Sequence, residues 1–196
     1  MYYEGIEPYL NNLEDKNIGI AGGSVVAMAM SSINSLIIYI CNLTIGKKKY
    51  MEVEDKVSEI LSEANNLKTK TLQFIDDDKA VLDKILTAYK NRMENPNAYY
   101  QACKDGVDFC VEVLETSVAI LQLTEKISLY GNRMLSSDFQ ICAHFGLASV
   151  KSSIVNVNIN LIEELGAEYT ENINRKCQNL LNEAVDISER IIENSK

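Results

Sequence analysis

The chain has 196 residues, with 28 acidic and 19 basic side chains and a formal net charge of −9. This acidic balance argues against nucleic acid as the main partner, and the length favours one domain, residues 1–196, with a sizeable core. Two prolines and nine glycines leave little loop, and the abundance of Ala, Leu, Ile, Lys, Glu and Asn predicts an all-α fold.

The N-terminal sequence contains no signal-peptide pattern. Tyr2, Tyr3, Glu4 and Glu7 occupy positions where a basic segment and an apolar segment would be needed. The cysteines are odd in number and lack CxxC spacing, which favours reduced core thiols over disulfides or a metal site. We therefore expect a cytoplasmic protein whose five thiols are buried: Cys41, Cys103, Cys110, Cys142 and Cys177.

The first predicted element is a short helix over residues 4–16, with Ile6, Leu10 and Leu13 on one face. A loop over residues 17–23 follows. A long apolar helix is then predicted from Val25 to Ile45. Its length approaches that of a membrane span, but it carries several Ser and Asn residues and no second such segment exists, so we expect a central core helix and no membrane contact.

Both ends of this apolar helix offer places for anions. Free N–H groups at a helix start can hold an anion, and the start is marked by Gly22, Gly23 and Ser24. The helix stops at Gly46, and a basic turn follows at once, formed by Lys47, Lys48 and Lys49. Three adjacent cations are conspicuous in an acidic chain and complement the negative end of the helix dipole.

The remaining elements are also helical. Apolar residues at helical spacing predict a helix over residues 53–93, and Asn95 and Pro96 supply the cap and first residue of the next helix, 96–130. Ser137 and Gln140 fit a capping box for a helix ending near residue 164, and a last helix covers residues 170–193. No strand-like alternation occurs.

Asp78 interrupts the apolar face of the helix predicted over residues 53–93. It lies four residues after Phe74 and four before Leu82, so its carboxylate points into that face. An interior carboxylate must be paired, protonated or functional, since unpaired burial is costly, and burial raises its pKa toward the range useful for proton transfer. The pattern leaves a structural and a functional role equally open, whereas Asp76 and Asp77 fit a solvated patch.

A polar stripe marks the helix predicted from Asp138 to Glu164, next to an apolar stripe. The polar stripe consists of Asp138, Cys142, Ser149, Ser152, Asn156 and Asn160, and the apolar stripe of Ile141, Ala148, Val155, Ile159 and Ile162. This arrangement predicts a polar cleft or a polar subunit contact. Asp138 also suits a helix start, and the two asparagines also suit interhelical hydrogen bonds.

His144 is the only histidine, and it has no Cys or His neighbour at ligand spacing. We therefore expect no metal site and an ordinary core or interface histidine.

Three blocks of the sequence resemble the cyclodeaminase/cyclohydrolase family, which includes the C-terminal domain of formiminotransferase-cyclodeaminase and stand-alone methenyltetrahydrofolate cyclohydrolases. The first block is Gly22-Gly23-Ser24-Val25 followed by Asn42 to Tyr50. The second is Asp78 with Leu82-Asp83 and Ala88-Tyr89. The third is Gly131-Asn132, Ser137-Asp138 and Asn156-Val157-Asn158-Ile159-Asn160-Leu161. Ile20 and Ala21 replace the family's usual Pro and Gly, and Asp108 stands where a proline is usual.

The resemblance implies an up-and-down bundle of about six helices, a homodimer formed through helix faces, and a folate one-carbon derivative with one or more glutamates as substrate. It makes Asp78 the catalytic acid/base. Lys47, Lys48 and Lys49 would meet the glutamate carboxylates. The pterin or its loop would be positioned by Gly22, Gly23, Ser24, Asp138, Asn156 and Asn160. No metal or cofactor beyond the tetrahydrofolate-derived substrate is implied.

Three functions remain open at this point. Hydrolysis of 5,10-methenyltetrahydrofolate to 10-formyltetrahydrofolate is favoured, because no formiminotransferase domain is fused to the chain. The sister reaction is formiminotetrahydrofolate cyclodeamination, which releases ammonia and gives 5,10-methenyltetrahydrofolate. A non-catalytic folate-binding or interaction module is the alternative of another class. A four-helix metal–carboxylate protein is disfavoured, since no Glu-x-x-His pair is present.

Overall fold

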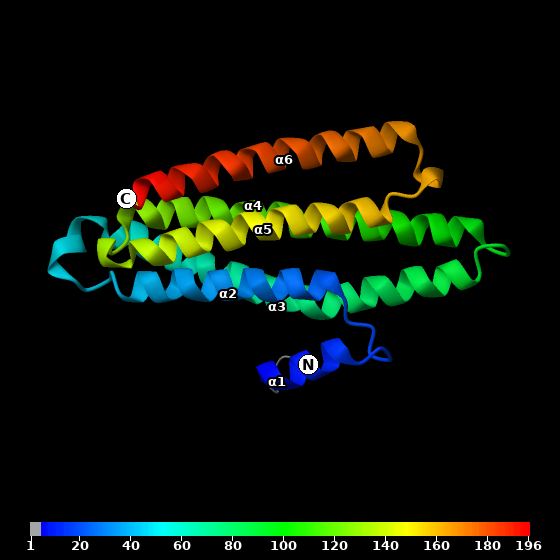
Figure 1. Ribbon diagram of the computed structural model, residues 1–196, viewed down its shortest axis with the longest axis horizontal. Coiled ribbons are helices and arrows are strands. Elements are labelled where there is room, and N and C mark those ends of the chain that lie inside the picture. Colours follow the sequence, from blue (N-terminus) through cyan, green and yellow to red (C-terminus); the bar gives the residue numbers. More distant parts are fainter. Residues whose placement is uncertain (1–4) are drawn as a thin grey trace.

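The computed structural model describes residues 5–196, which form six α-helices and no strand. Successive helices from α2 to α6 run antiparallel (Figure 1), with α2 and α5 in front, α3 and α4 behind them, and α6 along one edge. An all-α, up-and-down bundle of about six helices is therefore confirmed. The helices are α1 (Ile6–Glu14), α2 (Gly22–Asn42), α3 (Glu54–Lys90), α4 (Pro96–Tyr130), α5 (Ser136–Asn160) and α6 (Ala167–Asn194). Short 3-10 turns are η2 (Lys48–Val53), η3 (Arg133–Leu135) and η4 (Glu163–Leu165).

Helix α2 lies in the core of the bundle. It is long and apolar enough to cross a membrane by length and composition, but 56% of its most apolar window is buried inside the protein. Ile37 and Ile40 are fully buried, and Ser31 donates a hydrogen bond to Thr71 of α3 at 2.9 Å. The expected central core helix is therefore confirmed.

Several helix ends differ from the sequence-based expectation. Helix α2 starts at Gly22, so the Gly-Gly-Ser segment forms its first turn rather than a loop before it. The predicted capping box is wrong, because α5 begins at Ser136 directly after η3 and no side chain caps it. Helix α5 also ends at Asn160, four residues before the expected end. The chain is extended at Leu161 and Ile162 before η4 begins.

Other features match. Asn95 caps α4 as expected, since its side chain accepts a hydrogen bond from the backbone N–H of Ala98 at 3.1 Å. Helix α1 spans Ile6–Glu14 and is shorter than predicted, with position 4 lying outside the described residues. All five cysteines are free and buried. The hairpin of α3 and α4 extends beyond the start of α2 as an arm (Figure 1).

Asn132 fixes the end of the bundle that carries the basic turn. Its backbone N–H donates to Oγ1 of Thr44 at 3.0 Å, and its side-chain amide donates to the carbonyl of Leu43 at 3.3 Å. Its Oδ1 accepts from the hydroxyl of Tyr50 at 3.3 Å and from the N–H of Met134 at 3.2 Å. One buried residue thus joins the chain just after α2, Tyr50 of η2 and the start of η3.

Replacing Asn132 by alanine is expected to lower the free energy of unfolding by roughly 2–3 kcal/mol, because it leaves buried partners without hydrogen bonds. Urea denaturation measures the change. Asn158→Ala, an exposed position on α5, is the control and should change stability by only a few tenths of that amount. Equal effects of the two substitutions would contradict the anchoring role.

Candidate active site

A pocket of about 280 Å³ lies where the start of α2, the middle of α3 and α4, and the end of α5 meet. Its polar groups come from the first turn of α2, from Asp78 and from two asparagines of α5. Its apolar walls come mainly from α3, with one aromatic ring from α4. The residues that line it are Ala21, Gly22, Gly23, Asp78, Val81, Leu82, Ile85, Phe109, Cys110, Asn156, Ile159 and Asn160.

The Asp78 carboxylate sits against the N-terminus of α2. The backbone N–H of Ser24 donates to Oδ2 of Asp78 at 3.1 Å. The carboxylate therefore caps a helix from another element and faces the positive end of the helix dipole. A Cβ added to Gly23 would lie 1.8 Å from Oδ1 of Asp78, so only glycine leaves room for the carboxylate at this position.

Two opposing effects act on the Asp78 carboxyl group. Burial raises its pKa above the ordinary value, and the hydrogen bond from the Ser24 N–H lowers it by a smaller amount. Burial, together with the nearby charge of Asp78, also raises the pKa of the Cys110 thiol to about 11, so this thiol stays protonated. The carboxyl group is thus the one in the pocket whose pKa moves toward neutral pH, as a proton-transfer group requires.

Asn156 and Asn160 of α5 add polar side chains to the pocket, and Oδ1 of Asn156 lies 3.9 Å from where a Cβ on Gly22 would be. The side-chain amide of Asn160 donates to the carbonyl of Asn156 at 3.0 Å and to the sulfur of Cys110 at 3.4 Å. These bonds fix the orientation of the Asn160 amide. The two asparagines, one helical turn apart, border a pocket that contains a carboxylate, so the arrangement can bind a flat polar heterocycle.

Five of the predicted site residues come together in this pocket: Gly22, Gly23, Asp78, Asn156 and Asn160. The Ser24 side chain does not line it, because its hydroxyl donates to the carbonyl of Ala21 at 2.9 Å and contacts the Tyr9 hydroxyl at 3.2 Å. Ser24 reaches the site only through its backbone N–H.

The other predicted site residues lie at the opposite end of the bundle. The basic turn of Lys47, Lys48 and Lys49 is exposed and follows the far end of α2, roughly 30 Å from Gly22 by helix rise. Asp138 is in the first turn of α5, at that same far end. Within a single subunit, the three lysines and Asp138 are therefore far from the pocket.

The sequence did not single out Cys110, Phe109 or Ile85 as pocket residues. Ile85 could have been predicted, since it lies two helical turns after Asp78 and one after Leu82 on the same face of α3. Nothing in the sequence marked Cys110 and Phe109 as pocket residues, because their position depends on how α4 packs against α3.

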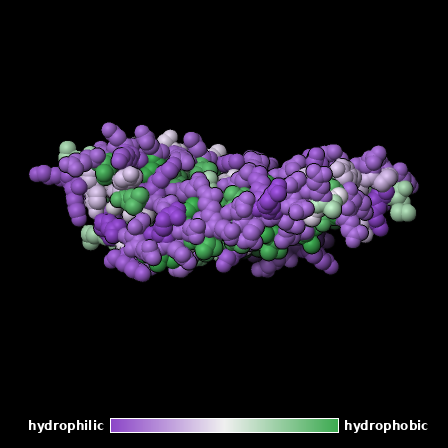
Figure 2. Space-filling view, turned by 90° about the horizontal axis from the view of Figure 1, so that it is seen from above, coloured by the Kyte–Doolittle hydropathy of each residue, from purple (hydrophilic) through white to green (hydrophobic). Residues whose placement is uncertain are grey.

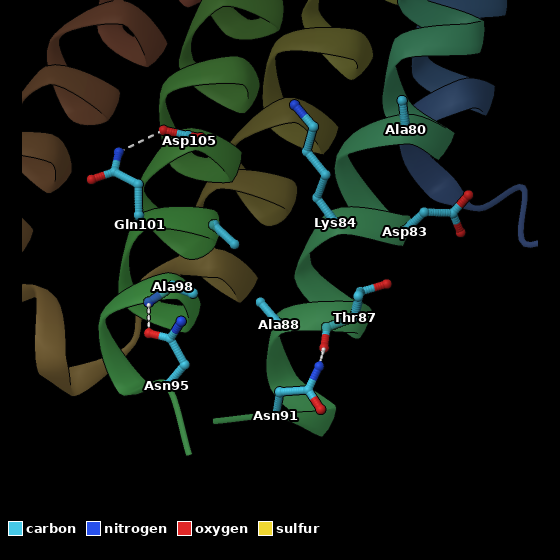
Figure 3. Close-up of a pocket in the computed structure, with 11 residues that line it drawn as sticks. Ala80, Asp83, Lys84, Thr87, Ala88, Asn91, Asn95, Ala98, Gln101 and Asp105 are labelled. Atoms are coloured by element: carbon cyan, nitrogen blue, oxygen red, sulfur yellow. Dashed lines mark hydrogen bonds between the residues drawn. The ribbon is translucent and has the colours of Figure 1, made fainter. Parts of the chain in front are cut away.

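A larger groove of about 710 Å³ lies between α3 and α4 along the arm (Figure 3). Its polar side chains are mostly satisfied locally: Gln101 donates to Asp105 at 2.8 Å, and Asn91 to the carbonyl of Thr87 at 3.4 Å. Its carboxylate Asp83 is paired with Lys79 at 2.6 Å. Alanines form much of its floor, so we place the chemistry in the smaller pocket, which contains the perturbed carboxyl group.

No group of three His, Cys, Asp or Glu residues within residues 5–196 is arranged to hold a metal ion. We expected His144 to be either a core or an interface histidine. It lies on the exposed face of α5, so the prediction of a core histidine is wrong.

The chain is similar to proteins of known description. A family model described as formiminotransferase-cyclodeaminase matches residues 5–179. A methenyltetrahydrofolate cyclohydrolase from Methylorubrum extorquens is 29% identical over 200 residues, covering 98% of this chain and 96% of the relative. The crystal structure of a formiminotetrahydrofolate cyclodeaminase from Thermotoga maritima superposes with a TM-score of 0.90 at 21% identity, covering 97% of this chain and 94% of that one.

Gly23→Ala and Gly22→Ala are expected to change stability in opposite directions. The Gly23 substitution forces the Asp78 carboxylate off α2 and should cost about 1–3 kcal/mol. At Gly22 the nearest contact of an added Cβ is 3.9 Å away, so alanine should stabilise the helix by up to about 1 kcal/mol. Chemical denaturation measures both, and similar changes at the two positions would show that Asp78 does not need the space above Gly23.

Proposed function

The chain belongs to the formiminotransferase-cyclodeaminase family, and on this premise we propose that it hydrolyses 5,10-methenyltetrahydrofolate to 10-formyltetrahydrofolate. The observation that carries the proposal is the Asp78 carboxyl group, held at a helix N-terminus and facing a pocket with polar and apolar walls. The similarity to a cyclohydrolase over nearly the whole of both chains supports it.

The proposed reaction adds water to the cationic carbon that bridges two folate nitrogens. Asp78 in its ionised form stabilises this cation and takes a proton from the attacking water as the C–O bond forms. The neutral hydroxyl adduct then breaks its bond to N5, and a proton moves to that nitrogen. Overall, the cation and water give 10-formyltetrahydrofolate and one proton.

The pocket around Asp78 suits the rest of this substrate. Asn156 offers an amide donor and acceptor for the pterin edge and Asn160 offers its amide oxygen, while Leu82 and Ile85 offer apolar surface for the rings. The reaction as written needs only water as the nucleophile and the cationic carbon of the substrate as the electrophile. We therefore propose a cytoplasmic enzyme that uses no cofactor beyond the folate.

The sister reaction is the second candidate, because the matched family and the similar crystal structure both carry the cyclodeaminase description. In that reaction a folate ring nitrogen attacks a formimino carbon and ammonia leaves, with Asp78 moving the proton. Ammonia release from formiminotetrahydrofolate without hydrolysis of the methenyl compound would favour it. Absence of both activities and of folate binding would favour a non-catalytic interaction module.

We also propose a homodimer, formed through the open face of α2 and α5 that points toward the viewer in Figure 1. A stripe of residues along α5, spaced three or four apart, faces solvent. Its four large apolar side chains are 47% to 78% exposed: Ile141, Phe145, Val155 and Ile159. Val25 and Tyr39 are similarly exposed on α2. Apolar atoms gather along the corresponding lower edge of Figure 2. Such a continuous face is typical of a subunit contact.

An antiparallel arrangement of two copies fits this face. The middle of the face carries the small exposed residues Ser32, Ala148 and Ser152, which allow two helix layers to approach closely. A twofold axis through the middle exchanges the two ends of the bundle. The basic turn and Asp138 of the partner subunit then lie at the pocket end of the first subunit, which accounts for site candidates roughly 30 Å apart in one chain.

Asp78→Asn is expected to lower kcat for methenyltetrahydrofolate hydrolysis by roughly a hundred- to ten-thousandfold. Asparagine keeps an acceptor for the Ser24 N–H and relieves the cost of burying a charge at neutral pH, so stability should be equal or slightly higher. The assay follows loss of the substrate's absorbance after subtraction of spontaneous hydrolysis. Asp76→Asn on the same helix is the control, and full turnover by Asp78→Asn would exclude the mechanism.

The pH dependence follows from the same group. Because the base must be ionised and burial raises its pKa, kcat should rise with pH through a midpoint above that of an ordinary aspartate. Asp78→Asn should lack this rise. A wild-type profile that stays flat down to the ordinary aspartate range would contradict a base with a raised pKa.

Phe145→Glu is expected to convert the dimer into monomers, since it places a charge in the proposed apolar contact, and to lower kcat/KM at the same time. Sedimentation analysis and the turnover assay measure the two effects. Leu86→Glu, a similarly exposed apolar residue on α3, is the matched control and should do neither. A wild-type protein that sediments as a monomer would refute the dimer.

A further inference from the structure

A cluster of aromatic residues with one arginine lies at the tip of the α3–α4 arm. The rings of Tyr89 and Tyr99 meet edge to face with their centres 5.6 Å apart, and the Arg92 guanidinium lies 3.8 Å from the centre of the Tyr89 ring. With Tyr100, Pro96 and Glu164 they border a pocket of about 310 Å³. The function proposed above makes no use of this cluster.

The cluster is in line with the Asp78 pocket along α3. The residues at 78, 82, 85 and 89 share one face of that helix. The first three line the Asp78 pocket and the fourth lines the tip pocket. Tyr89 lies about 16 Å from Asp78 by helix rise.

The facing elements show the same continuity. On α4, Tyr99 borders the tip pocket and Cys110 borders the Asp78 pocket, and beyond α5 the chain passes from Asn160 to Glu164. A Cβ added to Gly106, between these two ends, would lie 2.8 Å from Ile85 and 3.5 Å from Asn160. The three elements therefore pack closely together in the stretch that lies between the two pockets.

The charge of the cluster suits an anion. Arg92 donates one N–H to the carbonyl of Tyr89 at 2.9 Å, and within residues 5–196 no carboxylate forms an ion pair with it. The N-terminus of α4 borders the pocket at Pro96 and adds partial positive charge. Glu164 faces the same space and weakens this field. Burial is the main cause that raises the pKa of the Tyr99 hydroxyl, the hydrogen bond with Cys103 comes next, and the charge of Glu164 raises it further.

We propose that this tip cluster is the subsite for the glutamate end of the substrate, a deduction that rests on the proposed folate activity. A reduced folate carries its one-carbon unit on the pterin side of a p-aminobenzoyl ring and its carboxylates beyond that ring. With the one-carbon unit at Asp78, the ring lies along Leu82 and Ile85, and the carboxylates reach the arm tip. Arg92 pairs with a carboxylate there through its free N–H groups.

This assignment replaces the basic turn as the cation for the tail. Lys47, Lys48 and Lys49 lie at the other end of the same chain and reach a pocket only from a partner subunit. Arg92 lies in the turn directly after α3, the helix that carries Asp78, and its bond to the carbonyl of Tyr89 holds it against the last turn of that helix. The two assignments therefore differ in which positive charge binds the glutamate carboxylates, Arg92 or the lysines of the basic turn.

The test compares methenyltetrahydrofolate with methenyltetrahydropteroate, which lacks the glutamate. Arg92→Gln should raise KM for the glutamylated substrate roughly ten- to a hundredfold, the loss expected for a hydrogen-bonded charge pair. The kcat for that substrate, and both constants for the pteroate compound, should stay unchanged. Lys90→Gln, an exposed cation two residues away, is the matched control and should alter neither substrate.

Three results would overturn the subsite. They are an equal effect of Arg92→Gln on both substrates, no effect on either, or a glutamate-specific effect produced by replacing Lys47, Lys48 and Lys49 with glutamine instead. Calorimetric titration of the wild-type protein with p-aminobenzoylglutamate and p-aminobenzoate gives a second readout, and only the first compound should bind more weakly to Arg92→Gln. Lack of wild-type turnover refutes the proposed function, whereas an active enzyme without a glutamate-specific effect refutes only the subsite.

Discussion

The contact between the Asp78 carboxylate and the first turn of α2 is the constraint on which the rest of the site depends. It requires a glycine at position 23, because any Cβ there would overlap the carboxylate. It also joins α2 to α3 at the level where α4 and α5 complete the pocket. The same contact balances a helix terminus that favours the ionised carboxylate against burial that favours the protonated one.

The sequence predicted the helical fold because its signals are local. Apolar periodicity, the Asn95–Pro96 start and the absence of strand patterns act within a few turns of chain. The predicted capping box failed because Asn132, through η3, determines how the chain enters α5. Such an effect depends on contacts with Leu43 and Thr44, which are distant in sequence and cannot be read from local spacing.

The candidate site was predictable in part for the same reason. Asp78 could be found because a carboxylate breaks an apolar face, and the glycines and asparagines were found through family resemblance. The separation of the basic turn from the pocket was not predictable from motifs, which carry no distance. The length of α2 puts Lys47 at the far end of the bundle. A basic turn could lie near the pocket only if it came from a second subunit. The exposed apolar stripe of α5 supplies a physical reason for such an assembly.

The most direct measurement is the titration of the Asp78 carboxyl group itself in the resting protein. The carboxyl ¹³C resonance of aspartate-labelled wild-type protein, assigned by its loss in Asp78→Asn, gives the midpoint without any substrate or assay. The account predicts a midpoint above the ordinary aspartate value of 3.8, because burial outweighs the Ser24 N–H. A midpoint below that value would show a permanently ionised helix cap and would contradict a carboxyl group suited to proton transfer.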